Sequence, residues 1–385
     1  MSINEPAVTP YEIRISNDKI EKIKSRLVEA SWPKRAASSW QYGAPLSVMR
    51  DLVDYWTDQY DWKREQDRLN AMPQFRTIIG DGALHFVHKK SGNRAALPVV
   101  LLHGWPSSFY EFYGVAEQIS AGSSVPENAR DVVIVSLPGF TFSEFASPLG
   151  PKAIAALVDR LMSQVLGYPR YLVHGGDWGA IIATWLGLQY PERCAGIHIS
   201  MISARIAGAH ASTAEDQEWL TGFRARFEDD GAYFRLQTTR PLTISYALDD
   251  SPIGAAAWII EKFAAWSDIE SSTDGPDLWS VYTRDQLLTN IMLYLVSGSA
   301  GSAPWIYRAF AEEGPPNLSN GTRVEVPVGV VALSDPAFPT PPRGLVEKVY
   351  NVVHWGKPGK GGHFPGFEIP EALTQDILTF ASDRR

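Results

Sequence analysis

The stretch Tyr171-Leu172-Val173-His174-Gly175-Gly176-Asp177-Trp178-Gly179 decides the fold of this chain. Its first four residues form a short apolar run typical of a buried strand, and a helical pattern begins near Ala180. Between them stands the form Gly-x-nucleophile-x-Gly, with Asp177 at the centre. Such a turn strains its central residue, and small flanking residues prevent clashes where the strand meets the helix. The pattern therefore predicts a tight strand-to-helix turn that presents Asp177 at a helix N-terminus.

Short apolar runs on both sides of this turn predict further strands, and helical stretches such as 151–166 separate them. These runs occupy residues 97–102, 131–135, 324–331 and 350–353. Buried strands that alternate with helices indicate an α/β chain with a mostly parallel, doubly wound sheet. Two alternating runs around Gly80-Asp81-Gly82 predict a hairpin that opens this sheet.

The strand pattern stops near Met201, and the following hundred or so residues are mainly helical and aromatic. This change predicts a helical lid inserted into the sheet domain. We therefore expect four segments along the chain. They are an N-terminal helical region at 1–74, a first part of the core at 75–204, the lid at 205–320 and a second part of the core at 321–385.

Asp177 is the candidate nucleophile. A carboxylate is already ionised at pH 7, and it is well suited to displacement at an sp³ carbon, which would leave an ester on the side chain. An Asp after glycines can also simply cap a helix. The complete five-residue pattern favours the nucleophile.

His103-Gly104-Trp105-Pro106 follows the strand at 97–102, where this kind of fold needs a backbone N–H aimed at the nucleophile. We expect the amides of Trp105 and Trp178 to form an oxyanion hole. The alternative is an ordinary turn that carries a core tryptophan.

His363 is the candidate base, because it lies in Lys360-Gly361-Gly362-His363-Phe364 after the final strand, and the chain order nucleophile, acid, histidine places the base there. The orienting acid should follow the preceding strand, and Asp335 is the only carboxylate between Glu325 and Glu347. A short acidic residue before proline is also a common turn former.

With these motifs together, the chain resembles the microsomal and juvenile-hormone type of epoxide hydrolase, which has an α/β-hydrolase fold. The resemblance covers nearly the whole chain. It rests on Pro10-Tyr11-Glu12-Ile13 to Trp32-Pro33, on the His103-Gly104-Trp105-Pro106 loop, and on Asp249-Asp250-Ser251-Pro252-Ile253-Gly254 to Glu261-Lys262-Phe263. The resemblance implies conversion of an epoxide to a vicinal diol without a metal or an organic cofactor.

The resemblance also implies two lid tyrosines that donate hydrogen bonds to the epoxide oxygen. Matching Gln237-Thr238-Thr239-Arg240-Pro241 to the family motif brings Tyr233 onto the first position, and Trp305-Ile306-Tyr307-Arg308 brings Tyr307 onto the second. A phenol suits this task because it stays neutral at pH 7 yet can give up a proton. Packing roles are the alternative for both.

The chain departs from the family pattern around the acid. That pattern places the acid shortly after a Phe-Pro pair, but Phe338-Pro339 is followed by Thr340-Pro341-Pro342-Arg343, which holds no carboxylate. Either Asp335 serves from a shifted loop, or His363 lacks its usual partner and water activation is slow.

Composition excludes several classes of protein. The formal net charge is −8 and there is no dense Lys/Arg run, so we expect no nucleic-acid partner. Cys194 is the only cysteine, which rules out an intrachain disulfide and fits a cytoplasmic protein. The start lacks a signal-peptide pattern, and no apolar stretch reaches roughly 18 residues, so we expect no membrane anchor.

The expected partner is a small apolar or aromatic epoxide, and the oligomeric state stays open, with a homodimer as one option. Two other functions remain as alternatives. A haloalkane dehalogenase shares the Asp-Trp turn, the ester and the late histidine, but it needs a halide cradle. A non-catalytic binding protein of the hydrolase fold would be expected to lose the nucleophile or the base, and both are present in this chain.

Overall fold

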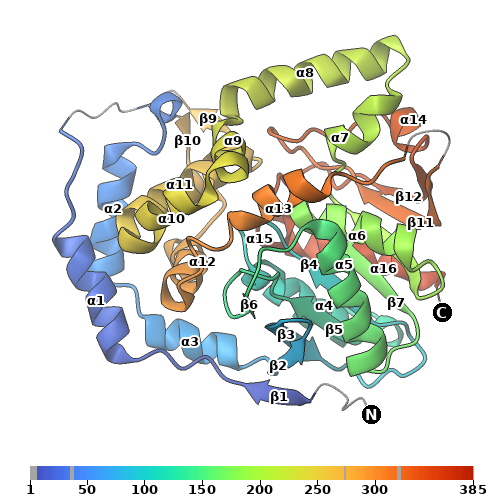
Figure 1. Cartoon of the computed structure of the whole chain (residues 1–385), viewed down its shortest axis with the longest axis horizontal. Helices are drawn as coiled ribbons and strands as arrows, with labels where there is room; N and C mark the ends of the chain where they lie inside the picture. Colours follow the sequence, from blue (N-terminus) through green and yellow to red (C-terminus); the bar gives the residue numbers. More distant parts are fainter. Residues whose placement is uncertain (1–6, 35–38, 273–274, 319–321, 385) are drawn as a thin grey trace.

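The centre of the molecule is a ten-stranded sheet in the order β1-β2-β3-β5-β4-β7-β8-β11-β12, with β6 paired to β3 (Figure 1). This computed structural model describes residues 7–34, 39–272, 275–318 and 322–384. The strands are β1 (Val8–Tyr11), β2 (Gln74–Ile79), β3 (Gly82–Lys89), β4 (Val99–Leu102), β5 (Val132–Val135), β6 (Glu144–Phe145), β7 (Tyr171–Gly175), β8 (Cys194–Ile199), β11 (Val324–Val331) and β12 (Tyr350–Gly356). A separate small ribbon joins β9 (Ser271–Ser272) and β10 (Gly275–Pro276).

All neighbours from β5 to β12 run parallel, and β1, β2 and β3 form an antiparallel extension. The predicted mostly parallel sheet and its opening hairpin are therefore confirmed. Strand β1 was not predicted. It is an exposed edge strand with a proline, Pro10, so it shows neither an apolar run nor a clear alternation.

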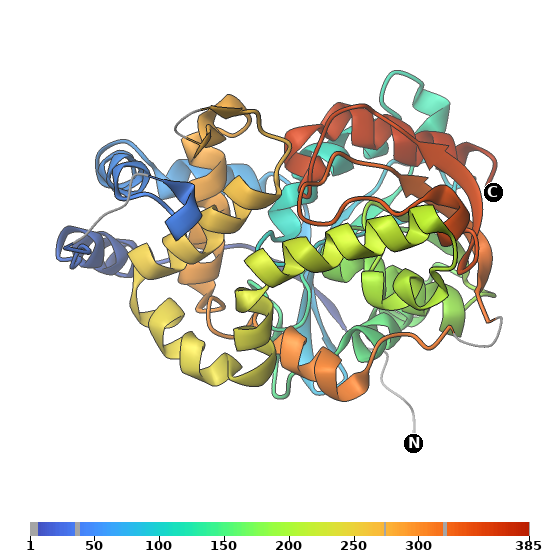
Figure 2. The same ribbon diagram turned by 90° about the horizontal axis from the view of Figure 1, so that it is seen from above.

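Helices cover both faces of the sheet (Figure 2). On one face α6 packs along β7 and β8 with α5 beside it, and α4 and α16 pack together on the other face. The core helices are α4 (Tyr113–Ala121), α5 (Pro151–Arg160), α6 (Asp177–Gln189), α14 (Arg343–Val346), α15 (Pro365–Glu368) and α16 (Pro370–Ser382). This arrangement places the N-terminus of α6 at the carboxyl edge of the parallel strands, where ligands bind in such sheets.

Helices α7 to α13 lie between β8 and β11 along the chain and cover the carboxyl edge of the sheet (Figures 1 and 2). They are α7 (Ala204–Ala207), α8 (Ala214–Asp230), α9 (Ala232–Thr239), α10 (Pro241–Asp250), α11 (Pro252–Trp266), α12 (Arg284–Ser297) and α13 (Trp305–Glu313). The segment boundary predicted between residues 320 and 321, and the start of the N-terminal segment at residues 1–6, lie outside the described residues. No helix of the described part combines the length and the apolar character needed to cross a bilayer.

The N-terminal helices contact the lid. They are α1 (Asn17–Val28), α2 (Leu46–Asp58) and α3 (Trp62–Asn70), and they pack on α11 and α12. Polar contacts reinforce this packing, because Arg64 pairs with Asp285 of α12 at 2.5 Å and the Tyr55 hydroxyl donates to the same carboxylate at 2.9 Å. The N-terminal region therefore supports the lid from the side away from the sheet.

The turn between β7 and α6 is as tight as its sequence predicts. Asp177 has a φ of 46°, a left-handed conformation that non-glycine residues rarely adopt. A Cβ on Gly179 would overlap the carbonyl oxygen of Leu102 in β4, and one on Gly175 would overlap the backbone of Gly179 itself. These two glycines let α6 begin in direct contact with β4, the neighbour of β7 in the sheet.

We predict that Gly179→Ala destabilises the protein by about 2 kcal/mol or more, because the added methyl group must push α6 away from β4. Thermal unfolding of purified variants measures this effect. Gly344→Ala is the matched control, since Gly344 is exposed in α14 and a Cβ there meets open space. Equal melting temperatures for the two variants would contradict the claim that the contact between Gly179 and Leu102 leaves no room for a side chain.

Candidate active site

Asp177 is the first residue of α6, and the loop after β4 holds its carboxylate. The backbone N–H of Trp105 donates to Asp177 Oδ1 at 2.9 Å. Gly104 allows this approach, because a Cβ at that position would overlap the Asp177 side chain. The N–H of Trp178 lies in the first turn of α6, where amides lack an acceptor within the helix. Both amides predicted for an oxyanion hole therefore belong to backbone that surrounds Asp177.

Lid helix α12 fixes the loop that carries the Trp105 amide. The side chain of Asn290, which is fully buried, donates to the carbonyl of Pro106 at 2.9 Å, and the Tyr294 hydroxyl donates to the carbonyl of Ser107. The Ser107 hydroxyl in turn donates to the buried carboxyl of Glu111. These residues were not predicted, because nothing in the sequence around Asn290 or Tyr294 indicates contact with a loop about 185 positions earlier.

His363 lies directly beside Asp177. Its Nε2 is 3.6 Å from Asp177 Oδ2, and its backbone N–H donates to the carbonyl of Trp266 at 2.9 Å. The rings of Trp266 and Phe338 lie 4.9 and 5.0 Å from the imidazole, measured between centroids. These contacts bury His363 and fix the direction of its ring.

Asp335 contacts the other side of the same imidazole. Its Oδ2 is 2.7 Å from His363 Nδ1, and its Oδ1 accepts hydrogen bonds from the N–H groups of Ala337 and Phe338 at 2.9 and 2.8 Å. Asp335 follows β11 and belongs to the loop that departs from the family pattern. Both oxygens of the Asp335 carboxylate are thus held. The structure brings Asp177, His363 and Asp335 together, with the imidazole between the two carboxylates.

The two carboxylates determine the charge of His363. Burial by itself lowers the pKa of this imidazole, but the negative charges of Asp335 and Asp177 outweigh burial and raise the pKa to about 10. With Asp177 ionised, His363 is consequently an imidazolium at neutral pH. Asp177 controls part of this effect, so any reaction that removes its charge also lowers the pKa of His363.

A cavity of about 180 Å³ opens at Asp177. Tyr233 of α9 and Tyr307 of α13 both line it, are almost fully buried, and have ring centroids 6.0 Å apart. Trp105 stacks on the Tyr233 ring at 5.4 Å, and Trp178 meets the Tyr307 ring edge to face at 4.7 Å. The lid thus places both predicted tyrosines beside the two residues predicted to form the oxyanion hole.

Both tyrosines are neutral phenols at physiological pH. Burial raises the pKa of Tyr233 well above its usual value, and the charge of Asp177 adds to this effect. Burial also raises the pKa of Tyr307, with further contributions from Tyr233 and Asp177. A neutral phenol retains its hydrogen and can donate it to an acceptor in the cavity.

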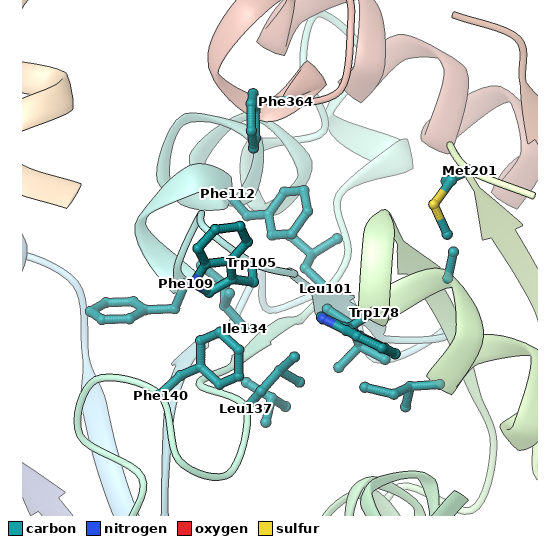
Figure 3. Close-up of a cluster of buried hydrophobic side chains, with 14 of the residues drawn as sticks. Leu101, Trp105, Phe109, Phe112, Ile134, Leu137, Phe140, Trp178, Met201 and Phe364 are labelled. Atoms are coloured by element: carbon teal, nitrogen blue, oxygen red, sulfur yellow. The ribbon is translucent and has the colours of Figure 1, made fainter. Parts of the chain in front are cut away.

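Aromatic and aliphatic side chains form most of the rest of the cavity wall, which also includes Ser203 and Arg205. Figure 3 shows Trp105 after β4 and Trp178 at the start of α6 within one buried cluster that also includes Met201. The further apolar lining residues are Ile181, Phe223, Phe227, Phe234, Phe310 and Phe338. These residues make most of the lining apolar, and none of them carries a motif that could have identified it from the sequence.

A second polar cluster lies apart from the cavity lining. The Nε2 atoms of His198 and His354 lie 2.9 and 2.8 Å from the two oxygens of Asp376, and His174 Nδ1 lies 2.9 Å from His198 Nδ1. Within the described part of the chain, His198, His354 and Asp376 are the group whose spacing could hold a metal ion. Their hydrogen bonds to one another already satisfy the carboxylate, and they tie β8, β12 and α16 together.

Comparisons with known proteins agree with this geometry. Residues 8–112 match the family "Epoxide hydrolase N terminus", and residues 98–247 match the "alpha/beta hydrolase fold". Epoxide hydrolase 1 of Sus scrofa is 30% identical over 98% of this chain and 89% of its own length. Juvenile hormone epoxide hydrolase 2 of Ctenocephalides felis is 32% identical over 97% of this chain and 85% of its own length.

The structure of Aspergillus niger epoxide hydrolase superimposes with a TM-score of 0.86, covering 99% of this chain and 97% of that one at 27% identity. The α/β-hydrolase fold expected from the sequence is therefore confirmed. Epoxide hydrolase activity, which acts on an ether bond, is implied by these relatives. The chain belongs to the epoxide hydrolases of the microsomal and juvenile-hormone type, with their characteristic N-terminal region and α/β-hydrolase domain.

Proposed function

We propose that this protein hydrolyses an epoxide to a vicinal diol through a covalent ester on Asp177. One observation carries the proposal. Asp177 has one carboxylate oxygen held by the Trp105 amide, its other oxygen facing His363, and two neutral tyrosines in the same cavity. This combination supplies a nucleophile, an oxyanion site, a base and proton donors within one buried site.

In the first half-reaction, Asp177 Oδ2 attacks an epoxide carbon. The new bond joins that oxygen to the carbon, and the C–O bond of the strained ring breaks. Tyr233 and Tyr307 hydrogen-bond to the departing oxygen, and one of them transfers its proton, so that a hydroxyl forms instead of an alkoxide. Oδ1 remains on the Trp105 amide and becomes the carbonyl oxygen of the ester.

In the second half-reaction, His363 activates water. Forming the ester removes the negative charge of Asp177, and the pKa of His363 falls because that charge helped to raise it. The imidazolium then loses its proton, which restores the tyrosine, and the neutral imidazole accepts a proton from water. That water attacks Cγ of Asp177, and the Trp105 and Trp178 amides stabilise the oxyanion. When the oxyanion collapses, the ester bond between Cγ and the substrate oxygen breaks, and that oxygen takes the proton of the newly formed carboxyl group. The diol leaves, Asp177 is again a carboxylate and His363 is again an imidazolium. Asp335 holds the imidazole through Nδ1.

We predict that His363→Gln accumulates the ester, because attack by Asp177 does not need the imidazole whereas ester hydrolysis does. Peptide mass analysis after incubation with styrene oxide should show the adduct on the Asp177 peptide, and Asp177→Ala should show neither adduct nor diol. In ¹⁸O-labelled water, one turnover of the unaltered enzyme should place label in Asp177. An unlabelled Asp177 after turnover would sink the covalent mechanism, and chloride release from haloalkanes would favour the dehalogenase alternative.

We predict that Tyr233→Phe or Tyr307→Phe slows ester formation by about a hundredfold, the range that general acids supply, and that the double variant is slower still. Stopped-flow recording of tryptophan fluorescence under single-turnover conditions measures this step. Tyr282→Phe is the control, since Tyr282 is equally buried but does not line the cavity. Unchanged ester formation in the double variant would exclude the proton-donor role.

We predict that the pKa of His363 falls from about 10 by roughly one unit or more in Asp335→Asn and in Asp177→Ala, because each change removes a negative charge beside the imidazole. The pKa falls in both variants because the imidazolium form of His363 loses a negatively charged neighbour that stabilises it. NMR titration of the ring protons measures the shift. Asp383→Asn, at an exposed position near the C-terminus, should leave the titration unchanged. A pKa equal in all four proteins would refute this electrostatic coupling.

A further inference from the structure

The cavity at Asp177 has a charge pattern that epoxide opening does not require. Its lining holds two charged side chains, Asp177 itself and Arg205 of α7, and the other lining residues are apolar, aromatic or hydroxyl-bearing. We propose that Arg205 is a specificity residue that binds a carboxylate group carried by the epoxide substrate. This inference rests on the proposed function and names the substrate class of the same site.

Two aromatic rings of the cavity wall hold the guanidinium of Arg205. Its Cζ lies 5.0 Å from the ring centroid of Phe234 and 5.4 Å from that of Phe310. The Ser203 hydroxyl accepts a hydrogen bond from the Arg205 backbone N–H and caps the short helix. Cation–π contacts fix the plane of the guanidinium but use none of its N–H donors.

The donors of Arg205 therefore remain available for an anion. Across the described residues, no carboxylate oxygen lies within 4 Å of this guanidinium, whereas Arg193 in the core pairs with both oxygens of Asp159 at 2.7 Å. Arg205 is an exposed residue and also lines the cavity, so it lies where the cavity meets solvent. A planar fork of free donors in this position matches a carboxylate in a bidentate geometry.

The position of Arg205 relative to the reacting groups sets the shape of the substrate. Phe234 contacts both Arg205 and Tyr307, whose ring centroid is 5.3 Å from that of Phe234. Phe310 contacts both Arg205 and Trp178, at 5.2 Å between ring centroids. An epoxide held by the tyrosines would extend its apolar body along these rings and present its far end to Arg205. The carboxylate thus belongs on that far end, away from the negative charge of Asp177.

The test compares two substrates of the same shape, 4-(oxiran-2-yl)benzoate and its methyl ester. We expect the unaltered enzyme to prefer the acid in kcat/KM. Arg205→Gln should lose about fivefold or more on the acid, the upper range for a partly exposed ion pair, with little change on the ester. Arg205→Lys should retain part of the preference, because it keeps the charge without the planar fork.

The control variant is Arg235→Gln, which removes an equal charge from an exposed position on α9 beside Phe234 but outside the cavity lining. It should keep the preference for the acid. A preference for the acid that persists in Arg205→Gln, an equal loss on acid and ester, or the same effect in Arg235→Gln would overturn the assignment.

Binding of the diol product separates this inference from the proposed chemistry. Calorimetry with 4-(1,2-dihydroxyethyl)benzoate should show affinity that Arg205→Gln weakens by about fivefold or more, without any turnover. If the enzyme hydrolyses the neutral ester, but the unaltered enzyme and Arg205→Gln bind the diol acid with equal affinity, the role of Arg205 alone is overturned. Failure to hydrolyse acid, ester and styrene oxide would overturn the proposed function instead.

Discussion

The close contact between the start of α6 and β4 is the constraint on which the site depends. Gly179 lies against the carbonyl of Leu102, and this contact is compatible only with a residue that lacks a side chain. At the same turn Asp177 adopts a left-handed conformation, and its carboxylate accepts a hydrogen bond from the loop that follows β4. Strain at one residue is tolerated because the surrounding sheet and helix determine it from both sides. The close contact thus accompanies the tight turn that presents Asp177 to the loop after β4.

Charge balance is the second feature that organises the site. His363 is buried between two carboxylates, whose negative charges favour its positive form. The same negative charge also keeps the tyrosines protonated, and burial, which lowers the pKa of His363, raises the pKa of both phenols. One set of charges thus keeps the hydrogen on the donors and links the protonation state of the base to the state of Asp177.

The lid and the N-terminal helices form a second layer of support. Helix α12 bonds to the loop of the Trp105 amide through Asn290 and Tyr294, and α2 and α3 pack on α12 from outside. The N-terminal region is therefore linked through α12 to the loop that carries the Trp105 amide, although the helices and this loop lie apart along the chain. The lid also carries Tyr233 and Tyr307. It therefore both completes the cavity and holds the loop of Trp105 in place.

The sequence by itself determined the parallel sheet, the turn at Asp177 and the positions of His363 and Asp335, because each depends on local patterns or on chain order. It left β1 unrecognised, since an exposed edge strand has no periodic signal. Only the tertiary structure decided that Asp335 contacts His363 from a loop that departs from the family pattern. It also decided that Asn290 anchors the Trp105 loop and that Arg205 lines the cavity. These contacts join residues from different elements, so no spacing along the chain encodes them.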